Sequence, residues 1–175
     1  LCGQKSHPPS IDLAETLVTV APDTVSKVFF NNSGSEANDT AIKIIWYYNN
    51  ARGRHQKKKI IGRINGYHGI TLASSSLTGR SLNHAGFDVP LEKFIHTNNP
   101  HYYRFGEDGE TEEDFATRMA NDLDQLIIDE GPETVAAFFA EPIMGAGGVI
   151  TPPKTYFEKI QACLLYTSPS PRDKT

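Results

Sequence analysis

The chain has 175 residues, of which 38% are hydrophobic and 22% are charged, and its formal net charge is −4. This balance is typical of a globular domain and argues against disorder along the whole chain. The acidic balance argues against a nucleic-acid binder, and no apolar run approaches the roughly 20 residues of a membrane span. Cys2 and Cys163 lie too far apart in sequence to suggest a disulfide framework, so we expect a cytoplasmic protein.

The first half of the sequence alternates between helical and strand patterns. Residues 11–20 carry apolar side chains at a helical spacing, and 28–30 have the pattern of a short buried strand. A sharp turn at 33–35 leads into an amphipathic helix. Residues 59–64 then predict a second strand, and 70–77 predict a helix after it.

The second half continues the alternation. A short strand is expected at 94–96, and 98–109 is expected to be a loop rich in Asn, Tyr and Gly. Residues 111–129 give the clearest helical pattern, opened by a capping box. The apolar run 135–140 indicates a strand covered on both faces, and a last helix is expected over 154–163.

Strands that alternate with helices indicate a mostly parallel sheet between two helical layers, which is a three-layer α/β/α fold. Residues 164–175 differ from the rest, since they contain two prolines among polar residues and show no periodicity. We therefore expect residues 1–163 to form the folded part and residues 164–175 to be a disordered tail foreign to the natural protein.

The first candidate site is the turn at Ser33, Gly34 and Ser35, which follows a strand pattern and opens a helix. Ser33 with Glu36 fits a capping box, which leaves the amides of Gly34 and Ser35 pointing out of the first turn. Such amides and the helix dipole suit a phosphate group. The same residues are compatible with a well-capped helix that binds nothing, since capping boxes are common.

The second candidate site is the segment Gly66-Tyr67-His68-Gly69, directly after a strand pattern. The flanking glycines allow a tight turn that presents Tyr67 and His68 at the carboxyl edge of the sheet, where ligands bind in open α/β folds. The ring of Tyr67 could stack there on a planar cofactor. Alternatively, Tyr67 packs on the core and His68 is a structural histidine.

The third candidate site begins at Glu141, which follows the most apolar strand pattern and precedes glycines at 145, 147 and 148. A carboxylate at the end of a buried strand needs a partner, which favours a place in a cleft over a surface ion pair. Parallel strands bring all three candidate sites to one edge of the sheet. The sequence has no zinc-type ligand spacing, and we predict no metal site.

The ordered segments 29–38, 66–69 and 141–149 together resemble the class III aminotransferases. These are fold type I transferases that depend on pyridoxal phosphate, and the similarity is greatest to the ω-amino acid or amine:pyruvate branch. It extends over about 6–162. The resemblance implies that residues 1–163 are part of the large cofactor-binding domain of such an enzyme.

The resemblance also assigns roles to individual residues. It implies that Ser33, Gly34 and Ser35 hold the cofactor phosphate, that Tyr67 stacks on the pyridine ring and that His68 supports its loop. Glu141 would lie near the substrate side of the ring. The implied activity is transfer of an amino group from an amine or ω-amino acid to a keto acid such as pyruvate, by a homodimer.

The family's Schiff-base lysine and its aspartate at the pyridine nitrogen belong to segments that this chain does not contain. We therefore assign no catalytic residue and expect the chain to be inactive alone. Three alternatives stay open: a related class III decarboxylase or aminomutase, a non-catalytic α/β module that binds a phosphate ligand, and a chain that does not fold stably because its sheet edge is open.

Overall fold

The computed structural model describes residues 7–167, which divide after Asn32 into two units. The first unit contains α1 (Pro8–Val20), which confirms the helix expected at 11–20. The helix begins three residues earlier because its two opening prolines suit a first turn, where no intrahelical N–H is needed. The ring of His7 caps it by accepting a hydrogen bond from the Ser10 N–H at 3.2 Å.

The prediction of a strand at 28–30 is wrong. These residues are not part of any strand, and the side chains of Phe29 and Phe30 are exposed. An extended segment becomes a strand only when a neighbouring strand takes up its N–H and C=O groups. The apolar run thus indicates a segment with strand propensity, but nothing among the described residues pairs with it.

The second unit is built on a parallel sheet of three strands, β1 (Lys59–Arg63), β2 (Phe94–Thr97) and β3 (Val135–Phe138). Their order is β2-β1-β3, so β1 is central. Ile61 lies opposite Ile95 on one side and opposite Phe138 on the other. The structure therefore confirms the three later strands and their parallel arrangement.

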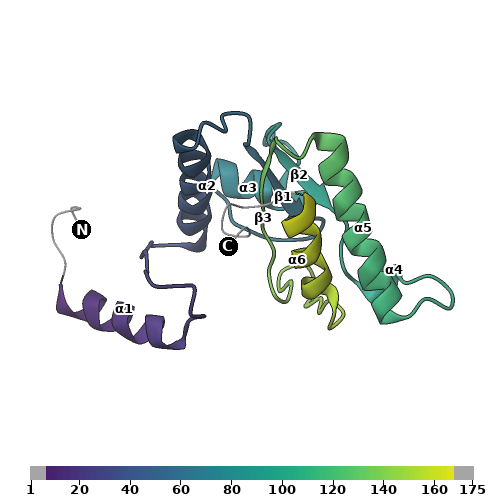
Figure 1. Ribbon diagram of the computed structural model, residues 1–175, viewed down its shortest axis with the longest axis horizontal. Helices are drawn as coiled ribbons and strands as arrows, with labels where there is room; N and C mark the ends of the chain where they lie inside the picture. The colour runs from purple at the N-terminus through teal and green to yellow at the C-terminus, as the bar shows by residue number, and fades with distance from the viewer. Residues whose placement is uncertain (1–6, 168–175) are drawn as a thin grey trace. The chain divides into compact units, whose positions relative to one another are not determined.

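Helices cover both faces of this sheet, as Figure 1 shows: α2 (Gly34–Ala51) and α3 (Leu72–Leu77) on one face, α5 (Glu112–Glu130) and α6 (Tyr156–Thr167) on the other. Ile60 packs with the α2 and α3 side chains, whereas the next residue, Ile61, packs with those of α5 and α6. This alternation follows from the two-residue period of a strand. The expected three-layer fold is confirmed.

The segment expected to be a loop at 98–109 contains a one-turn helix, α4 (Tyr102–Phe105). Its Tyr102 ring packs edge-on against Phe115 of α5, with ring centroids 5.5 Å apart, and its hydroxyl donates to the Glu110 carbonyl. Four residues are too few to give a periodic signal, so tertiary packing forms this turn. A 3₁₀ turn, η1 (Ser81–Asn83), follows α3.

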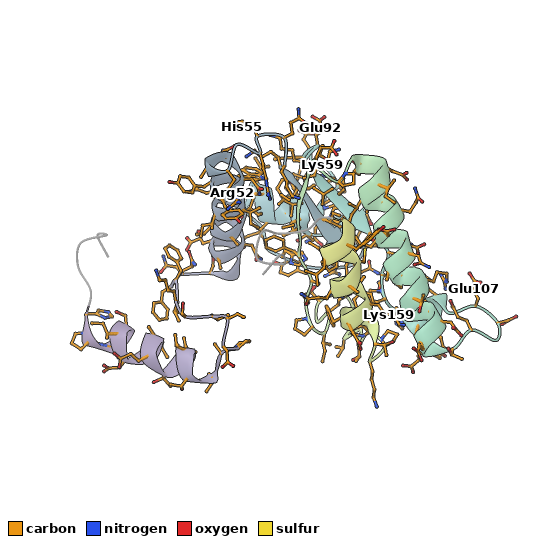
Figure 2. The ribbon with its side chains drawn as sticks, viewed as in Figure 1. Arg52, His55, Lys59, Glu92, Glu107 and Lys159 are labelled. Carbon is orange, nitrogen blue, oxygen red and sulfur yellow. The ribbon has the colours of Figure 1, made fainter. Side chains whose placement is uncertain are left out.

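The ends of α5 agree with the sequence pattern. Thr111 and Asp114 form the expected capping box, with the Asp114 N–H donating to Thr111 Oγ1 at 3.1 Å. Two ion pairs tie α5 to its neighbours: Lys59 Nζ lies 2.6 Å from Glu130, and Lys159 Nζ lies 3.5 Å from Glu113. Figure 2 labels both lysines. Exposed pairs of this kind contribute about 0–1 kcal/mol each.

The last helix extends beyond the expected domain boundary. α6 runs to Thr167, so residues 164–167 of the expected tail are helical. Cys163 and Leu164 pack against the core of α5 and α6, which accounts for the extra turn. The remainder of the expected tail, 168–175, lies outside the described residues. Among the residues described, no helix is long and apolar enough to cross a membrane.

Candidate functional site

The three sequence motifs meet at the carboxyl edge of the sheet. β1 leads into the loop that carries Tyr67 and His68, and β3 leads into the loop that carries Glu141. The N-terminus of α2 joins them, because Ser35 Oγ accepts a hydrogen bond from the Ile70 N–H at 3.0 Å. The expected convergence of Ser33–Ser35, Gly66–Gly69 and Glu141 is therefore present in the structure.

Ser33 is the N-cap of α2, and its hydroxyl accepts a hydrogen bond from the Glu36 N–H at 3.2 Å. Gly34 and Ser35 are the first two residues of the helix, so their N–H groups have no partner within it. The space around Gly34 is open, since a Cβ placed there would have no neighbour within 4 Å. The positive end of an 18-residue helix thus lies beside open space at Gly34.

Gly69 allows the second motif to approach the first closely. Its φ is +134°, a conformation that side-chain-bearing residues rarely adopt. A Cβ at this position would overlap the side chains of Ser35 and Ser74. The backbone of the Tyr67 loop can therefore reach the N-terminus of α2 only because residue 69 lacks a side chain.

Glu141 joins the second and third motifs through both of its carboxylate oxygens. Oε1 accepts a hydrogen bond from the Tyr67 N–H at 3.0 Å, and Oε2 accepts one from the Gly145 N–H at 3.2 Å. The expectation that this carboxylate has partners in the cleft is met by main-chain amides rather than by a cation. The Tyr67 side chain is left 37% exposed, so its ring is accessible to a ligand.

The side chain of His68 is buried, and both its main-chain N–H and its main-chain carbonyl form hydrogen bonds. Its N–H donates to Thr78 Oγ1 at 2.9 Å, and its carbonyl accepts a hydrogen bond from Asn38 Nδ2 at 2.6 Å. Its ring meets Phe139 edge-on. Burial lowers the pKa of His68 below its ordinary value of 6.5; the charges of Arg63 and His96 act in the same direction, and that of Glu141 opposes them. The ring is therefore neutral at pH 7 and acts as a packing group.

Sequence reasoning gave no role to several residues that build this site. Asn38 lies one turn after Ser35 on α2, and the next residue, Asp39, accepts hydrogen bonds from Thr71 Oγ1 at 2.8 Å and the Ser74 N–H at 3.1 Å. Both are polar residues about one helical turn after the N-terminus of α2, and this spacing is a signal that could have identified them. Arg63 was also given no role, although a charged residue inside an apolar central strand is itself unusual.

The arrangement is chemically compatible with a phosphate at the N-terminus of α2 and a flat ring beside Tyr67 and Glu141. It offers amide donors, an exposed aromatic face and a carboxylate at one sheet edge, and this donor set matches the two parts of a phosphorylated pyridine. Among the residues that the structure describes, no cluster of three or more His, Cys, Asp or Glu side chains could hold a metal ion.

Comparison with known proteins identifies the relatives of the chain. Residues 2–164 match the aminotransferase class-III family. The chain is 60% identical over 157 residues to the probable gamma-aminobutyrate transaminase 2, mitochondrial, of Oryza sativa subsp. indica, a match that covers 89% of this chain and 32% of the relative. It is 58% identical over 161 residues to the gamma aminobutyrate transaminase 3, chloroplastic, of Solanum lycopersicum, covering 91% and 31%.

Solved structures agree with these relatives. The omega transaminase from Pseudomonas jessenii in complex with PMP superimposes with a TM-score of 0.93 at 60% identity, over 95% of this chain and 37% of that structure. The chain thus spans about a third of the length of the proteins it matches.

The expectation of a cytoplasmic protein is wrong. The low cysteine content suggested it, but similar relatives from rice and tomato are mitochondrial or chloroplastic transaminases. A low cysteine count is common to several reducing compartments, so it could not distinguish between them. The match over 2–164, together with the convergence of the three motifs at one sheet edge, leads to one conclusion: the chain belongs to the class III aminotransferase family.

Proposed function

We propose that this chain forms the phosphate and ring site of a pyridoxal phosphate-dependent transaminase. The observation that carries the proposal is the hydrogen bond from the Ile70 N–H to Ser35 Oγ, because it brings the N-terminus of α2 next to the Tyr67 loop. Class III aminotransferases use this cofactor, and the open space at Gly34 is compatible with its phosphate.

Each residue has a distinct role in the proposal. The amides of Gly34 and Ser35 bind the phosphate, and Ser33 fixes the first turn of α2 so that they point outward. Tyr67 stacks on the pyridine ring, and Glu141 holds the Tyr67 loop and borders the substrate side of that ring. His68 supports the loop from below as a neutral group. Pyridoxal phosphate, when bound, supplies the electron sink through which an amino group is transferred.

For the whole protein, we propose transfer of an amino group from an amine or ω-amino acid to a keto acid such as pyruvate. The donor class is supported by relatives that are named gamma-aminobutyrate and omega transaminases. We further propose that the whole protein is a homodimer, as the family resemblance implies. Light scattering of the full-length protein would test the dimer, and a monomeric mass would contradict it.

The test of the cofactor site uses the 175-residue chain and pyridoxamine phosphate, which has the ring and phosphate but no aldehyde to react with surface lysines. We expect its binding to shift the NMR signals of the Gly34, Ser35 and Tyr67 amides. We also expect it to bind at least tenfold more tightly than inorganic phosphate, because the ring adds a stacking contact.

The variant Tyr67→Ala should reduce the affinity for pyridoxamine phosphate about tenfold and leave that for inorganic phosphate unchanged. The control Tyr47→Ala removes another exposed tyrosine, from the C-terminal half of α2, and should change neither affinity. Equal affinity for both ligands would support the simpler phosphate-binding module. Binding without shifts at Gly34 and Ser35 would contradict the proposed site.

A further inference from the structure

The guanidinium of Arg63 is buried directly beneath the candidate site. Arg63 is the last residue of β1 and is only 1% exposed, which makes it one of the largest fully buried side chains among the described residues. Its Nη2 donates a hydrogen bond to the main-chain carbonyl of Glu141. Within the part of the chain that the structure describes, no carboxylate forms an ion pair with it, and its Nε and Nη1 have no hydrogen-bond partner.

Two aromatic rings hold this guanidinium from the side of α6. The rings of Tyr156 and Phe157 both lie with their centroids 5.8 Å from the guanidinium carbon. Attraction between a cation and the face of an aromatic ring offsets part of the cost of burying the charge. Burial raises the pKa of Tyr156, and both the charge of Arg63 and a side-chain hydrogen bond with Arg63 oppose that rise.

The main chain of Arg63 is engaged in the other loop. Its carbonyl accepts a hydrogen bond from the Gly66 N–H at 2.9 Å, which closes the turn that leads to Tyr67. One residue therefore contacts both loops of the site: the Tyr67 loop through its backbone and the Glu141 loop through its side chain. Glu141 in turn returns to the Tyr67 loop through its Oε1.

A buried arginine with two unpaired nitrogens is costly, and an apolar side chain would fill the same space with less penalty. What an apolar residue cannot supply is the donor to the Glu141 carbonyl. We propose that Arg63 is a positioning residue, which fixes the backbone of Glu141 so that its carboxylate meets the amides of Tyr67 and Gly145. The effect of Arg63 on a bound ring rests on the function proposed above. Its effect on the geometry of the two loops does not depend on that function.

The geometric test needs no ligand and follows hydrogen exchange of the Tyr67 and Gly145 amides. In Arg63→Met we expect both amides to exchange at least tenfold faster, while the core amide of Leu123 on α5 keeps its rate. Arg63→Lys, which retains a donor and a positive charge, should recover part of the protection. Rates within twofold of wild type at both amides in a folded Arg63→Met chain would overturn the proposal.

The matched control is Arg52→Met, which removes an exposed arginine at the C-cap of α2. Figure 2 labels Arg52, which lies between α2 and the start of β1. This variant should leave the Tyr67 and Gly145 amides unchanged.

A measurement on the unsubstituted chain covers the case in which Arg63→Met fails to fold. The Nη protons of Arg63 should exchange at least a hundredfold more slowly than those of Arg52, and equal rates would overturn the proposal. A separate experiment measures ligand binding. Arg63→Met should lower the affinity for pyridoxamine phosphate severalfold and leave the affinity for inorganic phosphate unchanged. If the unsubstituted chain binds neither ligand, the proposed function fails, and the exchange rates still decide the role of Arg63.

Discussion

The carboxylate of Glu141 accepts a hydrogen bond from the main-chain N–H of Tyr67 at 3.0 Å, across 74 positions of sequence. Its second oxygen accepts from the Gly145 N–H, so one side chain holds two loops at the carboxyl edge of the sheet. The Glu141 side chain therefore fixes the Tyr67 loop and its own loop relative to each other.

Glu141→Gln should lower the free energy of unfolding by about 1 kcal/mol, because an amide presents one oxygen and one NH₂ group where two N–H donors need acceptors. Urea unfolding of the purified chain would measure the loss. The control Glu92→Gln changes an exposed glutamate in the loop before β2 and should have no measurable effect. Equal stability of the two variants would show that the carboxylate does not hold the loops together.

Gly69→Ala should destabilise the chain on the order of 3 kcal/mol, because the new Cβ would both strain the backbone and overlap Ser35 and Ser74. Gly109→Ala is a matched control, since Gly109 also has a positive φ, +82°, but its Cβ would meet open space. That control should cost only about 1 kcal/mol. Thermal unfolding of both variants checks the difference, and similar losses would mean that the loop moves away from α2 without penalty.

The lowered pKa of His68 predicts a loss of stability on acidification. The unfolded chain takes up a proton near pH 6.5, whereas the folded chain resists it because the ring is buried. The contribution of His68 is therefore complete above pH 6.5 and is lost as the pH falls from there toward its folded pKa. Burial lowers the pKa of His96 too, which adds to the same slope. NMR titration of the His68 ring should give a midpoint below 6.5, and a midpoint above that value would contradict its burial.

The ion pair between Glu110 and Arg118 predicts a separate acid transition. The hydrogen bonds from Arg118 hold the pKa of Glu110 at about 2, against an ordinary 4.5, with Nη2 2.7 Å from the carboxylate. The pair therefore contributes fully above pH 4.5, and its contribution is lost as the pH falls toward 2. Arg118→Met should return the pKa of Glu110 toward 4.5, as carboxyl NMR signals would report. Glu107→Gln, which removes the carboxylate 3.8 Å from Arg118, should leave it near 2.

We predict that the chain alone does not catalyse transamination, since the family resemblance implies that the Schiff-base lysine and the aspartate at the pyridine nitrogen belong to segments outside this sequence. Purified chain mixed with pyridoxal phosphate, an amine donor and pyruvate should form alanine no faster than the cofactor does by itself. Chain-dependent alanine formation would require a nucleophile that we have not identified.

The sequence predicted the second unit well because its signals are local and strong. Ile60 and Ile61 mark a strand buried on both faces, and the capping box at Thr111 marks the start of a long helix. It failed where an element depends on partners: residues 28–30 have strand propensity but no neighbouring strand among the described residues, and α4 exists because Tyr102 packs on Phe115.

For the site, the sequence indicated which motifs converge but not what joins them. That Ser35 would accept from Ile70, or that Glu141 would bind amides rather than a cation, depends on distances no pattern encodes. Arg63 lay inside the strand predicted at 59–64 but was given no role, because a strand is predicted from its apolar positions and these do not show whether a charged side chain among them is buried.

The adjacent isoleucines of β1 do not fix the register of this strand by themselves. A shift by one residue would exchange Ile60 and Ile61 between two hydrophobic layers, and both layers would accept an isoleucine. The next two residues remove that ambiguity. A Cβ at position 62 would run into the Leu77 carbonyl, so only glycine fits against α3, and the charged end of residue 63 is accommodated only between the α6 aromatics and the Glu141 carbonyl. Gly62 and Arg63 thus allow only one register of the central strand. The same two residues cost the core some stability, and they determine where the site forms.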